Sequence, residues 1–206
     1  RPLRLVPGRE AVETLGDKAK FAILMRRLGL ADFTPETFTD KNAARFPCVL
    51  KRTDKWAGTG VALVDSLEAL EDCLLQEPWL GHPALLQALV PGRREFVTHA
   101  LFDQGRLLWH CSFSYEMPTD RTIRKGAAQV PMEDVETDSQ ALDVIVRVAR
   151  HLHYSGPLCA NFKMRDGRPL LLEINPRLGG SLMRPRSQAH LARALRALVD
   201  ACLARA

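Results

Sequence analysis

The sequence predicts an α+β fold, in which antiparallel hairpins alternate with amphipathic helices. Three apolar runs of strand length occupy the middle of the chain, at 85–90, 95–102 and 106–114. The last two are separated by Asp103-Gln104-Gly105, which is typical of a hairpin turn. Apolar residues at helical spacing lie on both sides of these runs, at 10–29 and 138–153.

The remaining elements follow from turn and capping signals. Gly29 is placed to cap the first helix at its C-terminus, and Ser66 is placed to cap a helix over 66–77 at its N-terminus. Further strands are predicted at 46–51, 61–64, 158–164 and 169–175, and a final helix at 187–205. At Val90-Pro91-Gly92 an apolar run is followed by a proline and a glycine. This change in composition predicts a first part over 1–90 and a second lobe over 91–206.

Composition indicates a folded globular protein. The 206 residues are 46% apolar and 26% charged, which is ordinary for such a chain and argues against bulk disorder. The net charge is +5, but the cations are spread along the sequence. The densest basic stretch, 184–205, alternates with apolar residues at helical spacing and is interpreted as a solvated helix face. We therefore expect no nucleic-acid partner.

Cysteine usage and hydropathy suggest the compartment. The five cysteines are odd in number and none are closely spaced, so neither a disulfide framework nor a C-x-x-C motif is visible. No apolar run approaches the roughly 20 residues that span a bilayer. We expect a cytoplasmic protein with no membrane partner.

One apolar run ends in three polar residues at alternate positions, Glu173, Asn175 and Arg177. Period two places them on one face if the strand remains extended through Pro176. A carboxylate, an amide oxygen and a guanidinium directed into one space suit Mg²⁺ and phosphate. The alternative is a strand end with scattered solvated groups.

The preceding strand favours the site. Arg165-Asp166-Gly167 makes 158–164 the natural hairpin partner of 169–175, so that Asn161 can lie beside Glu173 or Asn175. Gly179-Gly180-Ser181 follows directly, as a loop before a helix that suits close approach of a phosphate.

Lys51 ends an apolar strand and, if it faces inward, needs an anionic partner. Snorkelling at the surface is the alternative. Lys55, Gly58 and Gly60 follow it, and glycines beside a lysine permit a loop to cover a phosphate tail. A plain hairpin turn is the alternative there. The loop is neither a Walker A sequence nor a dinucleotide fingerprint.

The stretch 87–95 has the pattern of a hinge. Gln87 and the backbone near Leu89 are candidates to contact an adenine edge, and Glu95 is a candidate to accept ribose hydroxyls. On the polar loop 115–131, Arg124 and Lys125 are candidates to contact an acceptor or a γ-phosphate. An ordinary hairpin and a solvated loop are the alternatives.

Taken in order, these motifs resemble the ATP-grasp superfamily, in the branch of carbamoyl phosphate synthetase and biotin carboxylase. The matching stretches are Gly16-Asp17-Lys18, Val49-Leu50-Lys51, Gly58-Thr59-Gly60, 87–95, Asn161-Phe162-Lys163, Glu173-Ile174-Asn175-Pro176-Arg177 and Gly179-Gly180-Ser181. The resemblance covers roughly residues 12–200, and its last motifs are the most specific.

The resemblance implies a role for each position. Two α+β lobes would sandwich ATP, with Lys18 and Lys51 on its phosphates and the loop from Lys55 to Gly60, with Gly58, as a flap. Gln87, Leu89 and Glu95 match the adenine and ribose contacts. Asn161, Glu173 and Asn175 match ligands of Mg²⁺, for which Mn²⁺ is a substitute, and Arg177 together with Lys51 matches the catalytic charges on the transferring phosphate.

The resemblance also implies the activity. The expected enzyme is an ATP-dependent carboxylate-amine or carboxylate-thiol ligase that forms an acyl phosphate and releases ADP and phosphate. Its partners would be a small-molecule carboxylate and an amine, and the same resemblance allows a homodimer. The alternative is a non-catalytic ATP-binding module that regulates a larger protein.

Two departures from the family pattern affect this expectation. Asn161 stands where a Glu or Asp is common, and losing a carboxylate weakens attraction for a second Mg²⁺. The branch of carbamoyl phosphate synthetase tolerates an amide there. Family members also carry a preceding domain that helps to form the acceptor site, and we expect that domain to lie outside this chain.

Overall fold

The computed structural model describes residues 5–55, 59–124 and 130–204. Its helices and antiparallel sheets confirm the predicted α+β class. In chain order the elements are α1 (Arg9–Gly16), α2 (Lys18–Arg27), β1 (Thr37–Phe38), β2 (Cys48–Arg52), β3 (Val61–Val64), α3 (Leu67–Leu74), β4 (Ala84–Ala88), β5 (Arg94–Asp103), β6 (Arg106–Glu116), β7 (Met132–Val135), α4 (Ser139–His151), β8 (Gly156–Arg165), β9 (Arg168–Asn175) and α5 (Gln188–Leu203).

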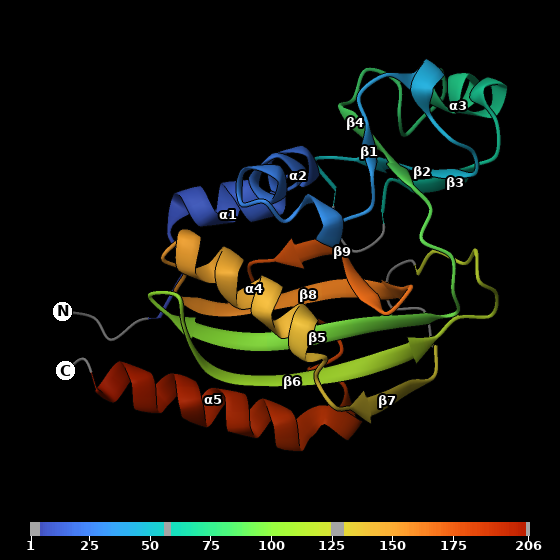
Figure 1. Cartoon of the computed structure of the whole chain (residues 1–206). Coiled ribbons are helices and arrows are strands. Elements are labelled where there is room, and N and C mark those ends of the chain that lie inside the picture. The colour runs from blue at the N-terminus through green and yellow to red at the C-terminus, as the bar shows by residue number, and fades with distance from the viewer. Residues whose placement is uncertain (1–4, 56–58, 125–129, 205–206) are drawn as a thin grey trace.

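A small lobe is built from a four-stranded antiparallel sheet in the order β1-β4-β2-β3. Figure 1 shows it together with α3, set apart from the larger sheet. It has its own apolar core, in which Leu50, Leu70 and Trp79 are buried. The N-cap predicted at Ser66 is confirmed, because its side chain accepts a hydrogen bond from the Ala69 amide.

The larger lobe contains a five-stranded antiparallel sheet in the order β7-β6-β5-β8-β9. Figure 1 shows α1, α2 and α4 on one face of this sheet and α5 on the other. The first face packs Met25, Ile145 and Leu171 into one core, whereas the second packs Phe113, Leu182 and Ala194 into another. Residues 9–27 therefore join the core of the larger lobe, and the domain boundary near residue 90 stays a prediction.

The helix predicted over 10–29 is wrong in one respect, because Asp17 divides it in two. Asp17 adopts an extended backbone, and its carboxylate accepts hydrogen bonds from the amides of Ala19 and Lys20. It therefore caps a second helix instead of continuing the first. The predicted cap at Gly29 is confirmed: its φ is +66°, and the Leu30 amide bonds to the Met25 carbonyl across it.

A β-bulge in the hairpin of β8 and β9 controls which side chains reach the second face of the large sheet. Asn161 pairs with Glu173 and Phe162 pairs with Leu171, so Leu172 is the additional residue. Leu171 consequently lies in the apolar core while Glu173 lies on the opposite face. Strict alternation from Leu171 would have put both residues on one face.

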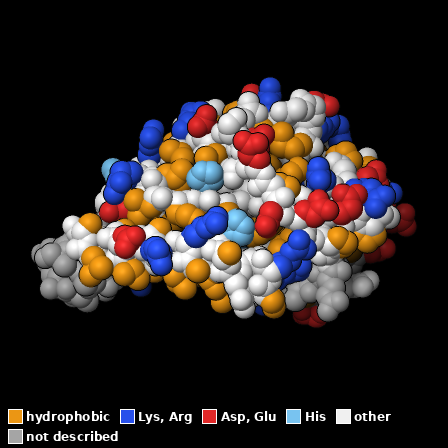
Figure 2. Space-filling view, turned by 90° about the horizontal axis from the view of Figure 1, so that it is seen from below, with side chains coloured by type: hydrophobic (Ala, Val, Ile, Leu, Met, Phe, Trp, Pro, Cys, Tyr) orange, Lys and Arg blue, Asp and Glu red, His pale blue; other side chains and the backbone are white. Residues whose placement is uncertain are grey.

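Helix α5 closes the second face of the sheet and leaves part of its own surface apolar. Leu195, Val199 and Leu203 are each about half exposed. Figure 2 views this side of the molecule, where apolar side chains lie among charged side chains of both signs. Among residues 5–55, 59–124 and 130–204, no helix is both long and apolar enough to cross a bilayer.

We predict that Leu171→Ala lowers the free energy of unfolding by about 2–5 kcal/mol, because it opens a cavity beneath β9. Leu171 is fully buried. The same substitution at the half-exposed Leu195 should change stability by less than about 0.5 kcal/mol. Urea unfolding followed by circular dichroism measures both values. Equal effects of the two substitutions would contradict this account of the core.

Candidate nucleotide and metal site

A cavity of about 860 Å³ lies where the small lobe faces the second surface of the large sheet. Strands β2, β3 and β4 line it from the small lobe, and β5, β6, β8 and β9 line it from the large lobe. The segment 176–186 completes the wall. The volume is near the upper end for small-molecule sites, which leaves room for a nucleotide and a second ligand.

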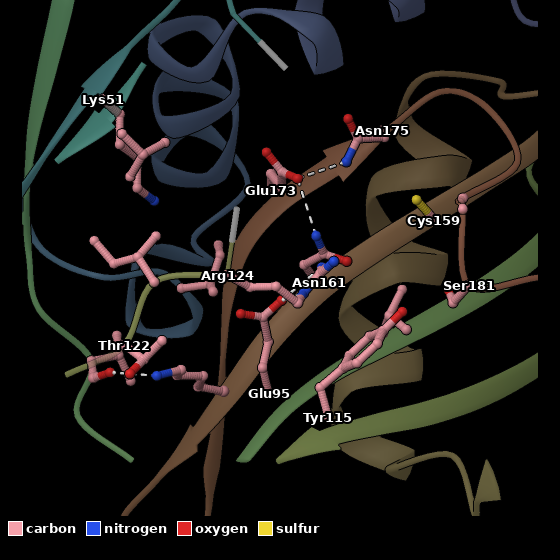
Figure 3. Close-up of a pocket in the computed structure, with 18 of the residues that line it drawn as sticks. Lys51, Glu95, Tyr115, Thr122, Arg124, Cys159, Asn161, Glu173, Asn175 and Ser181 are labelled. Atoms are coloured by element: carbon pink, nitrogen blue, oxygen red, sulfur yellow. Dashed lines mark hydrogen bonds and ion pairs between the residues drawn. The ribbon is translucent and has the colours of Figure 1, made fainter. Parts of the chain in front are cut away.

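The polar side chains of the β8–β9 hairpin meet in this cavity. Glu173 Oε1 accepts a hydrogen bond from Asn161 Nδ2 at 3.1 Å and another from Asn175 Nδ2 at 2.9 Å. Figure 3 shows the three side chains converging on one point. The predicted contact of Asn161 with Glu173 is therefore present, as a direct consequence of their register.

The donor set fits one hard cation better than two. Its oxygens come from one carboxylate and two amides, and within the described residues no three His, Cys, Asp or Glu side chains cluster as a metal site. Mg²⁺ is commonly held by one or two carboxylates and completes its shell with water and substrate phosphates. A cation on Glu173 would replace one or both of the amide hydrogen bonds.

Lys51 faces the cavity from β2 and is buried. Its Nζ donates to Gln87 Oε1 at 2.8 Å, and Gln87 in turn donates to Thr37 Oγ1. Burial lowers the pKa of Lys51 to about 8, an effect that Glu173 opposes and Lys18 reinforces. The inward orientation predicted for Lys51 is confirmed, and its partner in this structure is a neutral amide oxygen.

Lys18 reaches the same cavity from the start of α2. Its Nζ donates to the backbone carbonyl of Lys55, which ties the helix to the loop after β2. Burial lowers the pKa of Lys18, while the charge of Glu173 opposes this shift. Two buried ammonium groups thus face Glu173 without forming an ion pair with it. This arrangement favours an anionic ligand in the space between the two lysines and Glu173.

The loop after β2 connects β2 and β3 as a hairpin. Gly60 has a φ of +63°, and a Cβ there would lie 2.9 Å from Cβ of Arg52, so the turn requires glycine. Lys55 contributes its carbonyl to Lys18. Gly58 lies outside the described residues, as does Lys125 of the second loop.

The predicted hinge connects the two lobes. Leu89 and Val90 line the cavity, whereas Gln87 is occupied by Lys51 and does not line it. Lys163 donates to the carbonyls of Val90 and Gly92, at 3.3 and 2.7 Å. This role of Lys163 is not apparent from the sequence, because its acceptors are backbone groups about seventy residues away.

Glu95 lines the cavity from β5, and its carboxylate is paired with Arg124. The Arg124 guanidinium lies 2.8 Å from Glu95 Oε1 and 4.4 Å from the centre of the Tyr115 ring. Figure 3 shows Arg124 directed toward Glu95 inside the cavity. Sequence reasoning identified both residues separately but did not predict that they would pair.

The loop 179–181 is held against the sheet by His99, which sequence reasoning missed. His99 Nε2 and Ser181 Oγ are 2.6 Å apart, and burial, with Arg177 and His190, lowers the pKa of His99 to about 4. A Cβ on Gly179 would lie 2.6 Å from His99 Cε1. Only glycine permits this approach, and the loop is thereby fixed on the cavity wall beside Arg177.

A model of the ATP-grasp domain matches residues 15–181, which is most of the chain. The chain belongs to the ATP-grasp family. Its curated relatives include the arginine-specific large chain of carbamoyl phosphate synthase from Bacillus subtilis, 25% identical over 183 residues. That match covers 82% of this chain and 17% of the relative. The mitochondrial ammonia-dependent carbamoyl-phosphate synthase of Mus musculus is 26% identical over 147 residues, 68% of this chain and 10% of that protein.

Solved structures share the fold at lower identity. D-alanine–D-alanine ligase from Bacillus anthracis is 16% identical with a TM-score of 0.65, over 94% of this chain and 69% of that one. The biotin carboxylase domain dimer of 2-oxoglutarate carboxylase from Hydrogenobacter thermophilus, solved with MgADP, ADP and bicarbonate, is 18% identical with a TM-score of 0.65. That match covers 86% of this chain and 43% of the other. These likenesses confirm the ATP-grasp fold expected from the motifs.

We predict that nucleotide affinity falls as Lys51 loses its proton. Between pH 7 and 9.5, affinity for ADP without Mg²⁺ should weaken by about an order of magnitude, because Lys51, with a pKa near 8, is charged only at the lower end. Calorimetric titration measures the dependence.

Two variants test whether Lys51 is the titrating group. Lys51→Met should bind ADP more weakly with a flatter pH dependence, and some slope should remain because the pKa of Lys18 is also lowered. Lys41→Met, at an exposed lysine paired with Glu71, should keep the wild-type dependence. Constant wild-type affinity across this range would contradict the assignment of Lys51.

Proposed function

We propose that this chain binds Mg·ATP and activates a small-molecule carboxylate as an acyl phosphate for attack by an amine or a thiol. The observation that carries the proposal is a cavity in which the Asn161-Glu173-Asn175 oxygen set faces the ammonium groups of Lys18 and Lys51. Family relatives that are ligases, and a related structure containing MgADP, support it. The chain spans only 17% and 10% of the length of the two curated relatives above.

The proposed reaction has two steps. An acceptor carboxylate oxygen attacks the γ-phosphorus, the bond from that phosphorus to the bridging oxygen breaks, and ADP leaves with the electron pair. The nucleophile then attacks the acyl carbon, phosphate leaves, and the nucleophile loses a proton to water. Mg²⁺, when bound at Glu173, would neutralise phosphate charge.

The chain's own residues would position the nucleotide and stabilise the charge of its phosphates. Lys18 and Lys51 would hold the phosphates, and Arg177 would stabilise the transferring group, because fixed cations in a cavity act without reorganising during the reaction. The backbone at Leu89 would contact adenine, and Glu95 would accept ribose hydroxyls by sharing or releasing Arg124. The adenine contact of Gln87 stays a prediction, since its side chain already binds Lys51.

A second candidate is an ATP-binding module without catalysis. The specific observation in its favour is the amide of Asn161 at the position where a second metal-binding carboxylate would lie, which reduces the charge available to a second ion. Such a module would bind Mg·ATP but release no ADP with any acceptor.

We predict that Glu173→Gln removes Mg-dependent nucleotide turnover, with a loss of at least about 100-fold in ADP release. Binding of ATP without Mg²⁺ should stay the same or strengthen, because a negative charge facing the phosphates is removed. Calorimetry with and without Mg²⁺ and a coupled assay of ADP release with a panel of carboxylates and amines measure the two effects.

Glu133→Gln is the matched control, since Glu133 lies on β7 of the same sheet and its side chain is 71% exposed. It should leave Mg²⁺ dependence unchanged. If Glu173→Gln binds Mg·ATP and turns it over at the wild-type level, the metal assignment is wrong. If the wild-type chain binds Mg·ATP but releases no ADP across the panel, the second candidate replaces the first.

A further inference from the structure

The segment after β9 places three arginines on the cavity wall, Arg177, Arg184 and Arg186. Only Arg177 belongs to the phosphate-facing motif. Arg184 lies 5.5 Å from the centre of the Tyr115 ring, the same ring that Arg124 covers at 4.4 Å, and it also donates to the Val130 carbonyl. The wall near Tyr115 is therefore rich in guanidinium groups.

The charges of this cavity exceed what a nucleotide needs. The described lining includes three lysines and four arginines but only two carboxylates, Glu95 and Glu173. Arg124 already neutralises Glu95, and within the described part of the chain no carboxylate forms an ion pair with Arg177 or Arg186. Because Mg·ATP carries a charge of about −2, a cavity with a formal charge of +5 retains a positive excess when the nucleotide is bound.

The chain at Arg184 lies at one end of the cavity. Figure 3 shows Lys51 and Ser181 on opposite sides of the site, with Asn161 and Glu173 between them. The Arg184 amide bonds to the Ser181 carbonyl at 3.3 Å, so the backbone of Arg184 is at the end away from Lys51. From there the Arg184 side chain extends to the Tyr115 ring, which Arg124 also contacts.

Arg184 and Arg186 are two positions apart in the sequence, and both line the cavity. Pro185 separates Arg184 from Arg186 and opens the short turn Pro185–Ser187, directly before α5. The N-terminus of this 16-residue helix adds a positive partial charge nearby. A planar guanidinium group can bind two carboxylate or phosphate oxygens at once. An acceptor with no charge or a single charge would leave part of this binding capacity unused.

We propose that the acceptor of this chain carries a second anionic group, a carboxylate or a phosphate, which Arg184 and Arg186 bind while the reacting carboxylate lies near Arg177. This inference rests on the proposed function, since it assigns the substrate class of the same site. It makes Arg184 and Arg186 specificity-determining residues.

The test compares probes that differ by one anionic group. Succinate is paired with succinamate, and 3-phosphoglycerate with glycerate, and each is titrated calorimetrically into the chain saturated with Mg·ADP. At least one probe with two anionic groups should bind about tenfold tighter than its partner with one. The pair that shows the difference identifies the second group as carboxylate or phosphate.

Arg186→Gln should lower affinity for the preferred probe with two anionic groups about tenfold and leave the probes with one anionic group and ADP within about twofold. Arg186→Lys should retain part of the preference. Arg186 is exposed, so the fold should survive both changes. The control Arg196→Gln alters an exposed arginine of α5 outside the cavity lining and should change nothing.

The outcomes separate the two proposals. If Mg·ADP binds and neither probe with two anionic groups is preferred, or Arg186→Gln leaves the preference intact, the inference is overturned while the proposed function stands. If Mg·ADP does not bind, the titrations are repeated without nucleotide. A preference for two anionic groups that depends on Arg186 then supports the anion site alone, and the absence of such a preference overturns both proposals.

Discussion

The pairing of β8 with β9 is the contact on which the site depends. Its bulge turns Glu173 toward the cavity while Leu171 and Ile174 remain in the apolar core. The strand is thus anchored by apolar burial on one face and presents its polar groups on the other. Because the same short segment serves both purposes, the position of the carboxylate is fixed by core packing and not by a flexible loop.

A second feature is the way in which the protein's own groups hold the three buried lysines. Lys51 donates to an amide oxygen, Lys18 to a backbone carbonyl, and Lys163 to two carbonyls. None of these acceptors carries a full charge, so the ammonium groups are oriented but not neutralised. Burial lowers the pKa values of the three lysines, which reflects the free-energy cost of burying their charges. An anionic ligand would offset this cost.

Local signals in the sequence predicted most elements, and their failures have physical reasons. Alternating apolar residues and turn sequences located the hairpins, and capping residues located Ser66 and Gly29. Asp17 was missed as a helix break because a single cap within a periodic run does not disturb the apolar pattern. Strands β1 and β7, of two and four residues, form through pairing with β4 and β6 and carry little pattern of their own.

The sequence by itself determined the chemistry available to the site: the Glu173-Asn175-Arg177 spacing, the Asn161 partner one hairpin away, and the lysine that ends a buried strand. These follow from periodicity and short turns, which act over a few residues. Only the tertiary structure decided that Gln87 binds Lys51, that Arg124 pairs with Glu95, and that His99 holds Ser181. Those contacts join residues 29 to 82 positions apart, and such partners are brought together by strand pairing and packing within each lobe.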